Sequence, residues 1–253
     1  MAFYIGLSLL SNNRSFPSRR AQHEEGLRIL CLLDGKDAAR GIMRTRPDGR
    51  PCFTDHRADF SISHSGRMAA VSFSTERGAE TGLPLRTGCD IQFVDPRKNR
   101  EEIAREFFFP AEMAYISAAR EARERALRFC RIWALKECFL KTGGFSVFDI
   151  KLCPEFSLHT EEAALSVPGG VPVFSYRPQA ALSAGTPPAF HLYEYESPGA
   201  GLYVLAAARE ETPRAAQPSG PEVRWFSPET LPEASIAKIN AALSPAKTTS
   251  PKM

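Results

Sequence analysis

The sequence predicts an α+β fold in which strands and helices are partly segregated along the chain. Three observations support this class: a strand, a helix and a hairpin are expected early, a long helical region follows, and later strand-like runs are broken by Pro and Gly. The chain has 253 residues, 43% of them hydrophobic, which is enough for one large domain or two small ones with a real core.

The chain opens with an expected β-strand over residues 1–10. This stretch is apolar, but it lacks the positively charged start and the clear cleavage site of a signal peptide. The spacing of Leu27 and Leu30 then predicts a helix over residues 23–33, which should end at Gly35.

A β-hairpin is expected next. Residues 60–64 alternate apolar and polar side chains, residues 65–67 can turn, and residues 68–73 form a second strand-like run. The polar connection over residues 76–86 is the expected boundary between two halves of the protein.

A further strand is expected over residues 88–94. Because side chains alternate along a strand, Asp90 and Gln92 should share one face while the apolar residues between them face the core. A broken helical region is expected over residues 99–141, with Pro110 at the start of one helix.

The remaining chain has a strand-like pattern with a polar tail. Strands are expected over residues 145–150, 171–176, 190–195 and 202–208. Residues 223–226 are compatible with an edge strand, and residues 245–253 have a composition typical of disorder.

Composition excludes several classes of protein. The net charge is +3 and the isoelectric point is near 8.5, below the value above about 9 that is typical of a dedicated nucleic-acid-binding domain. No apolar run approaches the roughly 18 residues of a membrane span. The six cysteines form no CxxC pair, which indicates reduced thiols in a cytoplasmic protein.

Two clusters of polar residues are candidates for chemistry. Ser63, His64 and the following Ser-Gly pair lie at the hairpin tip and could approach a phosphate, or could simply satisfy backbone groups there. Asp90 and Gln92 share a strand face, where an acid is costly to bury unless it is paired or binds a cation. The alternative for this second cluster is an exposed strand face.

A third cluster lies in the helical region. At 100° per residue, Trp133, Lys136, Glu137 and Lys141 fall within an arc of about 140°. The arc suits either a metal–phosphate site or a solvated charged edge, on which Glu137 and Lys141 form a favourable i,i+4 pair.

The segment just before it, residues 120–131, carries five arginines and two glutamates. This segment is either a solvated helix face or a docking surface for an acidic protein or nucleic acid.

Taken together and in this order, these segments resemble the 4′-phosphopantetheinyl transferases of the surfactin-synthetase-activating type, within the holo-acyl-carrier-protein synthase superfamily. Residues 49–51 and 60–65 are similar to the family's Gly-Lys/Arg-Pro and Ser-His-Ser segments. Residues 88–92 are similar to its Gly-Ile-Asp-Ile-Glu strand, with Gln in place of the second acid and Cys in place of an apolar residue. Residues 107–112 and 133–141 are similar to its Phe-x-x-x-Glu and Trp-x-x-Lys-Glu-x-x-x-Lys helices.

The resemblance implies two similar halves related by pseudo-twofold symmetry, with coenzyme A bound in the cleft between them. The expected division is an N-terminal half over residues 1–86, a C-terminal half with the metal site over residues 87–212, and a partly disordered extension over residues 213–253. The implied reaction moves the 4′-phosphopantetheine arm of coenzyme A to a serine of an apo acyl or peptidyl carrier protein, releases adenosine 3′,5′-bisphosphate and requires Mg²⁺.

The resemblance also implies roles for individual residues. Mg²⁺ ligands are expected at Asp90, Gln92 and Glu137, with Gln92 weakening metal affinity by removing one negative charge. Glu137 is the expected base, and Lys136 or Lys141 the expected partner of the leaving phosphate. The expected contacts to coenzyme A are Arg50, Ser63, His64, Asp90, Lys136 and Lys141.

Two other functions stay open from the sequence. Gln92 is compatible with a catalytically weak or silent protein that binds coenzyme A or a carrier protein with the same fold. A nucleic-acid-binding module is disfavoured by the modest isoelectric point and by the glutamates among the arginines. The expected protein is cytoplasmic and binds neither nucleic acid nor membrane. A monomer is expected, because two halves of one chain already form the cleft.

Overall fold

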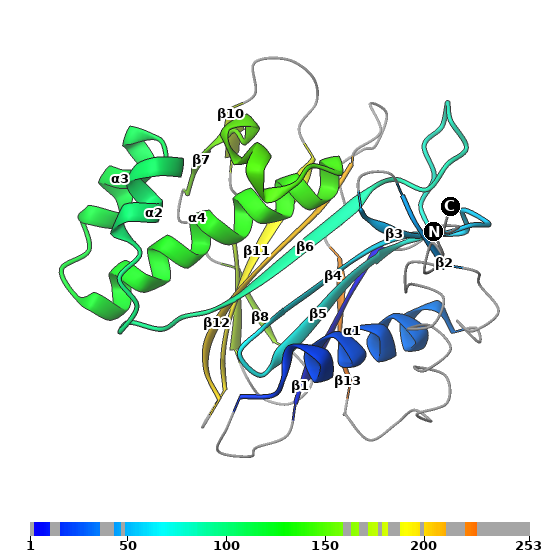
Figure 1. Ribbon diagram of the computed structural model, residues 1–253, viewed down its shortest axis with the longest axis horizontal. Helices are drawn as coiled ribbons and strands as arrows, with labels where there is room; N and C mark the ends of the chain where they lie inside the picture. The colour runs from blue at the N-terminus through cyan, green and yellow to red at the C-terminus, as the bar shows by residue number, and fades with distance from the viewer. Residues whose placement is uncertain are drawn as a thin grey trace, which may run out of the picture.

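A computed structural model describes residues 3–10, 16–35, 43–46, 49–158, 163–166, 172–176, 179–181, 188–197, 200–210 and 221–226. The fold is mixed α+β, with two larger sheets side by side and one long helix associated with each (Figure 1). None of the helices in this part of the chain combines the length and the apolar character needed to cross a bilayer.

The first sheet has the strand order β13-β1-β5-β4. Its strands are β1 (Phe3–Leu9), β4 (Asp59–Ser65), β5 (Met68–Ser74) and β13 (Glu222–Phe226). β4 and β5 form the expected hairpin, in which Ser65 pairs with Met68 and Gly66 adopts a left-handed φ of 58° in the two-residue turn. The expected edge strand near the end of the chain is confirmed as β13, which pairs in parallel with β1.

The second sheet has the strand order β6-β12-β11-β9-β8. Its strands are β6 (Thr87–Phe93), β8 (Ala163–Ser166), β9 (Pro172–Tyr176), β11 (Ala189–Ser197) and β12 (Gly201–Arg209). All its pairings are antiparallel. Two small sheets complete the strands, formed by β2 (Met43–Thr45) with β3 (Pro51–Phe53) and by β7 (Glu155–Ser157) with β10 (Gln179–Ala181).

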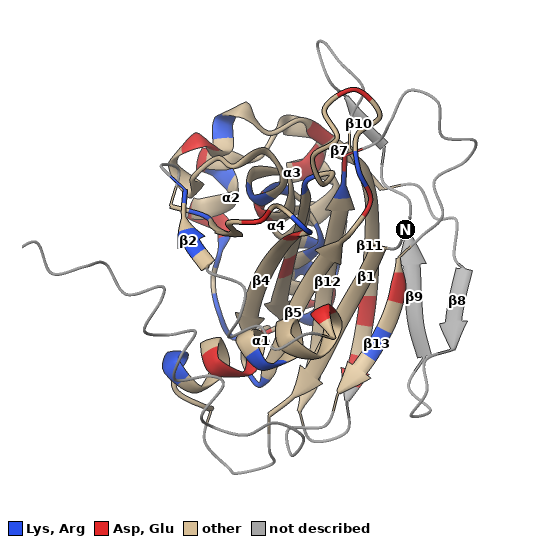
Figure 2. Cartoon of the chain, turned by 90° about the vertical axis from the view of Figure 1, so that its right-hand side faces the viewer, with Lys and Arg blue, Asp and Glu red and all other residues tan. Residues whose placement is uncertain are grey.

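Local signals place the helices, except that the first begins at Arg19 and not at residue 23, because the hydroxyl of Ser18 accepts a hydrogen bond from the N–H of Ala21. The helices are α1 (Arg19–Asp34), α2 (Glu101–Phe107), α3 (Pro110–Ser117) and α4 (Ala122–Gly143). Gly35 ends α1 in the left-handed conformation, as expected, and Pro110 opens α3. Charged residues of both signs lie on these helices around the sheets (Figure 2).

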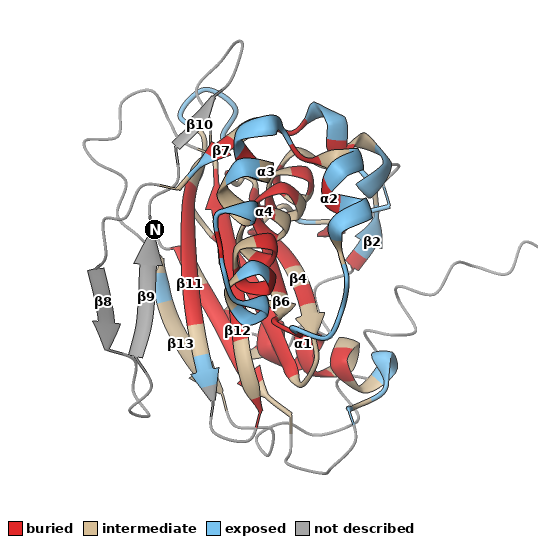
Figure 3. Ribbon diagram, turned by 90° about the vertical axis from the view of Figure 1, so that its left-hand side faces the viewer, coloured by how far each residue is buried: buried red, intermediate tan, exposed pale blue. Residues whose placement is uncertain are grey.

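Both long helices bury one face. α1 packs on the first sheet through Leu27, Ile29 and Leu30, and α4 packs on β6 and β12 through residues such as Ile132 and Leu135. Figure 3 shows α4 with buried residues along most of its length, and its exposed residues lie in the first turn. Most of its later charged side chains are half-buried beside the apolar stripe, whereas Lys136 is fully buried.

The expected strand over residues 145–150 is wrong. Residues Val147–Leu152 form a 3₁₀ helix, η1, because the Asp149 carboxylate accepts hydrogen bonds from the backbone N–H and the hydroxyl of Ser146. This reciprocal cap stabilises a helical turn at the point where the alternation of apolar residues predicts a strand. The expected disorder over residues 245–253 lies outside the described residues.

Candidate functional site

The site lies where β4 of the first sheet runs beside β6 of the second (Figure 1). The two strands are joined by side chains and not by a backbone ladder. The hydroxyl oxygens of Ser63 and Ser65 accept hydrogen bonds from the backbone N–H groups of Ile91, at 3.2 Å, and Phe93, at 2.9 Å. The paired residues are 28 positions apart in each case, so the strands run in the same direction.

The same spacing continues along the whole of β4. Asp59 accepts from the N–H of Thr87, and the Cys89 thiol donates to the carbonyl of Ser61. Asp59, Ser63 and Ser65 contact β6 through their side chains, and Ser61 contacts it through its carbonyl group. The polar face of β4 is therefore the face toward β6. The sequence alternation from Asp59 to Ser65 was the signal for this junction, although alternation alone predicts only a strand with one polar face.

Asp90 is the centre of a compact polar cluster on β6. Its side chain is 3% exposed, and its Oδ1 accepts hydrogen bonds from Ser63 Oγ at 2.8 Å and from Lys141 Nζ at 2.6 Å. Its Oδ2 accepts from the Gln92 amide at 2.7 Å, and Lys141 also donates to Ser63. The structure therefore brings together four predicted site residues from β4, β6 and α4.

Glu137 lies one helical turn before Lys141 and is the second carboxylate near this cluster. Burial raises the pKa of Glu137, and the negative charge of Asp90 raises it further, while the Lys141 ammonium opposes the shift. Burial lowers the pKa of Lys141 and is the largest single effect, but the charge and hydrogen bond of Asp90, together with Cys89 and Glu137, leave the net pKa raised. Lys141 is therefore held in its charged form between two acids.

A cavity of about 310 Å³ adjoins the cluster. Lys141, Gly144 and Phe145 from the end of α4 line one side of it. The other side is formed by residues of α1, the β2–β3 region and β4, namely His23, Gly49, Arg50, Pro51, Phe60, Ser61, Ile62 and His64. Its walls combine aromatic surface with several cationic or ionisable groups.

The pKa of His64 depends on the positive charges around this cavity. Burial lowers the pKa of His64, and the neighbouring His23 and Lys141 lower it further. A cluster of groups that disfavours a further positive charge favours an anion. His64 and Lys141, both predicted phosphate contacts, therefore line one electropositive cavity.

Lys136 lies elsewhere. Its ammonium is fully buried, 3.0 Å from Glu112 of α3, and packs over the ring of Phe109 at 4.7 Å. The structure does not bring Lys136 to the Asp90 cluster. The reason is that an arc of about 140° is wide enough for one helix to contact two different elements. Lys136 faces α3 and Lys141 faces β6.

Arg50 lines the cavity, but its guanidinium also bonds to the protein. Its Nη2 donates to Asp59 and to the carbonyls of Phe60 and Thr87, and its Nη1 donates to the carbonyl of Lys141. The sequence motif marked Arg50 as a cation near a ligand and gave no sign of these four partners.

The arginines at the start of α4 also have protein partners. Arg123 pairs with Glu196 of β11, and Arg128 pairs with Glu124 one turn away. A second cavity, of about 560 Å³, lies between α2, α3 and α4, and none of the predicted site residues lines it. Its rim includes Arg97, Lys98, Arg100 and Arg125.

The donor set for a metal consists of two carboxylates and one amide. Within the described ranges there is no group of three or more His, Cys, Asp or Glu side chains that could hold a metal ion. The set at this site is Asp90, Glu137 and Gln92, and such oxygen donors match the preference of Mg²⁺ over softer metals. The raised pKa of Glu137 beside Asp90 also shows that the two acids together would gain from a cation.

Comparison with known proteins gives one family. A family model described as the 4′-phosphopantetheinyl transferase superfamily matches residues 86–180, which include β6 and α4. The matched region thus contains both acids of the site and Lys141.

Curated proteins from several bacteria are similar to the chain. The 4′-phosphopantetheinyl transferase AcpT of Salmonella typhi is 31% identical over 137 residues, covering 51% of this chain and 67% of that protein. The 4′-phosphopantetheinyl transferase HetI of a Nostoc species is 24% identical over 168 residues, covering 61% and 65%. The 4′-phosphopantetheinyl transferase Sfp of Bacillus subtilis is 34% identical over 101 residues, covering 40% of each chain.

Proposed function

The chain belongs to the 4′-phosphopantetheinyl transferase superfamily, and on this basis we propose that it transfers the 4′-phosphopantetheine arm of coenzyme A to a serine of an apo acyl or peptidyl carrier protein. Adenosine 3′,5′-bisphosphate is the second product. Among the types within the superfamily, the order of its motifs favours the surfactin-synthetase-activating one.

One observation carries this proposal. Lys141 belongs both to the Asp90 cluster and to the electropositive cavity, so one side chain joins an acidic site to an anion site. Coenzyme A needs that pairing, because its nucleotide phosphates seek cations while transfer to a hydroxyl needs a carboxylate base nearby. His64 and Lys141 hold phosphate groups, and Ser63 and Asp90 hold Lys141 in place.

The residues of the site account for each step of the proposed transfer. The carrier serine Oγ forms a bond to the β-phosphorus of coenzyme A, and the pyrophosphate P–O bond breaks. Glu137 takes the proton of the serine hydroxyl. Lys141 stabilises the charge that develops on the departing bisphosphate. The nucleophile comes from the partner, so the proposal requires no activated Ser or Cys of this chain.

Asp90, Glu137 and Gln92 are the residues that would hold Mg²⁺. Bound there, the ion would neutralise negative charge on the phosphates of the substrate. Gln92 would offer a neutral oxygen or orient a water, which suits a weaker metal site and not a dead enzyme.

The arrangement of the chain and its setting belong to the same proposal. We place the N-terminal half at residues 1–86 and the C-terminal half at residues 87–212, with pseudo-twofold symmetry between them. The position of α1 with three strands of the first sheet, and of α4 with the second sheet, supports this division, while β13 joins the first sheet from beyond both halves. A cytoplasmic monomer is favoured, and the six buried free cysteines suit a reducing compartment.

Mass spectrometry tests the proposal directly. Candidate apo carrier proteins are incubated with the protein, coenzyme A and Mg²⁺, and one phosphopantetheine group should be added to the carrier serine. Glu137→Gln should fold and bind coenzyme A but transfer little. Failure of the unsubstituted protein to modify any fatty-acid, polyketide or peptide-synthesis carrier would count against the enzyme.

A silent coenzyme A- or carrier-binding protein is the second candidate, and Gln92 is the observation that favours it. The Gln92 amide occupies one oxygen of Asp90 in a position where the family motif has an acid. Binding of coenzyme A measured by calorimetry, without modification of any carrier, would favour this function.

A further inference from the structure

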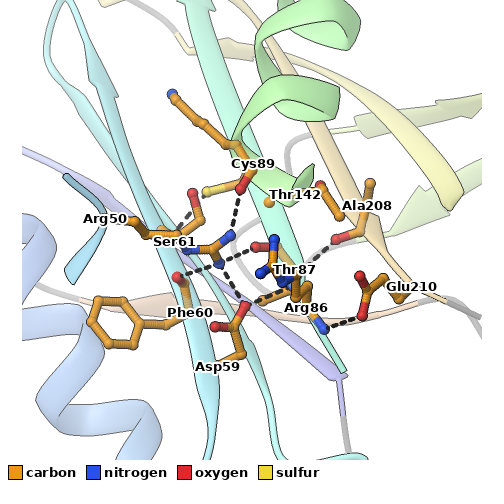
Figure 4. Close-up of polar contacts among 12 residues, drawn as sticks. Arg50, Asp59, Phe60, Ser61, Arg86, Thr87, Cys89, Thr142, Ala208 and Glu210 are labelled. Atoms are coloured by element: carbon orange, nitrogen blue, oxygen red, sulfur yellow. Dashed lines mark hydrogen bonds and ion pairs between the residues drawn. The ribbon is translucent and has the colours of Figure 1, made fainter. Parts of the chain in front are cut away.

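Arg50 is held by acceptors from three separate parts of the chain. Its Nη2 donates to Asp59 Oδ2 at 2.5 Å and to the carbonyls of Phe60, at 2.8 Å, and Thr87, at 2.5 Å. Its Nη1 donates to the carbonyl of Lys141. One guanidinium thus connects the start of β4, the start of β6 and the last turn of α4 (Figure 4).

The last turn of α4 needs such partners. The final carbonyl groups of a helix find no N–H donor within the helix itself, so they need donors from elsewhere. The helix dipole also favours cations at this end. Arg50 takes the carbonyl of Lys141, and Arg86 takes the carbonyl of Gly143 at 2.7 Å. The side chain of Lys141 and the carboxylate of Glu137 project from this same part of the helix.

Asp59 fixes Arg50 in turn. Its side chain is 3% exposed, it accepts from Arg50 and from the N–H of Thr87 at 2.8 Å, and Arg46 lies 3.5 Å away. Asp59 does not line the cavity, so it has no route to a bound phosphate. Substituting either Arg50 or Asp59 therefore breaks the same ion pair, but only Arg50 borders the cavity.

We propose that Arg50 and Asp59 are positioning residues that fix the end of α4 against β4 and β6, so that Lys141 and Glu137 meet the substrate in register. Arg50 acts on the reaction through the backbone of Lys141 and not as a phosphate ligand. This inference rests on the proposed function for its kinetic consequence, while the structural part stands on the contacts alone.

Two conservative variants separate positioning from phosphate binding. Arg50→Lys keeps a positive charge at the cavity, but a single ammonium cannot span the carbonyls of Thr87 and Lys141 together with Asp59. Asp59→Asn keeps the shape and removes the charge that fixes the guanidinium. Arg44→Lys is the matched control, because Arg44 is an exposed arginine on the neighbouring strand β2.

The kinetic result expected is a fall in kcat. Both variants should lower kcat by about 10- to 100-fold, the loss that a misplacement of order 1 Å can cause. KM for coenzyme A should change much less than kcat, because His64 and the other cavity residues stay in place and only Lys141 and Glu137 are displaced. The double variant should be no worse than the worse single one, because both act through one contact. Arg44→Lys should leave both constants unchanged.

Hydrogen exchange supplies a readout that does not depend on activity. Amides of residues 137–143 should exchange faster in both variants, while residues 122–130 keep their protection. If the protein modifies no carrier at all, the proposed function fails but this exchange pattern still tests the positioning contact. Unchanged exchange would overturn the positioning role, as would a large rise in KM for Arg50→Lys with Asp59→Asn neutral. Should Arg50→Lys fail to fold, Asp59→Asn decides alone.

Discussion

At the scale of single residues, Gln92 would set the charge of the proposed metal site. Its amide donates to Asp90 at 2.7 Å, so a neutral group faces a carboxylate there. Gln92→Glu adds a negative charge, and at 4 Å and an effective dielectric of about 20 a unit charge contributes up to about 4 kcal/mol of attraction for a cation. Activity should therefore reach half its maximum at a Mg²⁺ concentration at least about tenfold lower, equivalent to about 1.4 kcal/mol.

A magnesium titration of the transfer rate measures this effect. Gln92→Met is the control, because it removes the amide without adding charge and should not lower the Mg²⁺ requirement. An unchanged requirement in Gln92→Glu would mean that residue 92 has no part in holding the ion.

His64 should titrate below its ordinary pKa of about 6.5 in the free protein, since burial and the charges of His23 and Lys141 disfavour its protonated form. Between that ordinary pKa and the lower folded value, the unfolded chain binds the proton and the folded chain does not. His64 therefore reduces stability as pH falls through this window. The negative charge of bound adenosine 3′,5′-bisphosphate should raise the pKa of His64. The protein should therefore bind the bisphosphate more tightly as the pH falls.

NMR titration of the imidazole signals, assigned with His64→Gln, measures this shift. A free-protein midpoint at or above the ordinary value, or no change on adding the bisphosphate, would show that His64 does not face the anion.

Lys136 should contribute to stability and not to the proton or phosphate chemistry. Its ammonium is fully buried against Glu112, which also accepts from the backbone N–H groups of Phe109 and Phe156. Lys136→Met leaves a buried carboxylate unpaired and should lower the free energy of unfolding by about 3–5 kcal/mol. Combining it with Glu112→Gln should restore part of that loss in a urea titration. A stable Lys136→Met protein that binds coenzyme A but cannot transfer would instead return Lys136 to the active site.

At the scale of elements, the site depends on how closely α4 approaches β6. A side chain at Gly88 would meet the hydroxyl of Thr142 and two backbone atoms of α4, with the carbonyl oxygen of Cys138 at 2.6 Å and the amide nitrogen of Thr142 at 2.7 Å. Backbone atoms cannot move aside without shifting the helix. Glycine is therefore needed here for contact distance, not for a left-handed φ.

Gly88→Ala should destabilise the protein by about 1–3 kcal/mol through overpacking and should lower transfer activity by displacing Glu137 and Lys141. Gly143→Ala, on the helix that Gly88 meets, is the comparison, because the three atoms nearest to its new methyl all belong to the exposed ring of Phe145, which can turn away. Thermal unfolding of the two proteins separates the effects. Equal midpoints would mean that β6 and α4 tolerate a wider spacing.

Local signals predicted most elements but not their partners. The hairpin of β4 and β5, the faces of β6 and the start of α3 at Pro110 were all predictable, because each follows from alternation, turn residues or proline chemistry within a few positions. Residues 145–150 were mispredicted as a strand because a side-chain cap outweighed an apolar alternation. Motif order assigned Asp90 and Lys141 to one site, and in the structure the two side chains are in contact at 2.6 Å.

The directions of Lys136 and Arg50 could not be predicted in the same way. A helical wheel gives the angle of a side chain but not the element that faces it, and Lys136 meets α3. The acceptors of Arg50 lie 9 to 91 residues away along the chain, beyond the reach of any local pattern.

At the scale of the whole molecule, the two larger sheets share one hydrophobic core. One cluster of buried side chains contains Ile5 of β1 and Met68 of β5 from the first sheet, with Ile91 of β6 and Leu205 of β12 from the second. Either sheet alone would expose this surface to water, which is unfavourable in proportion to its apolar area. The two sheets should therefore be one folding unit, even though the proposed active site lies between them.

Calorimetry of the whole chain should accordingly show one unfolding transition, with equal calorimetric and van't Hoff enthalpies. Ile5→Ala and Ile91→Ala place a cavity on opposite sides of the shared core, and each should lower the stability of that single transition by about 2–5 kcal/mol. Arg44→Lys, on the exposed face of β2, should leave it in place. Coenzyme A should shift the whole transition upward, because a ligand held by residues of both sheets binds only when both are folded. Two separate transitions, with only one of them moved by Ile5→Ala, would show that the sheets fold independently and that the cleft between them forms by docking.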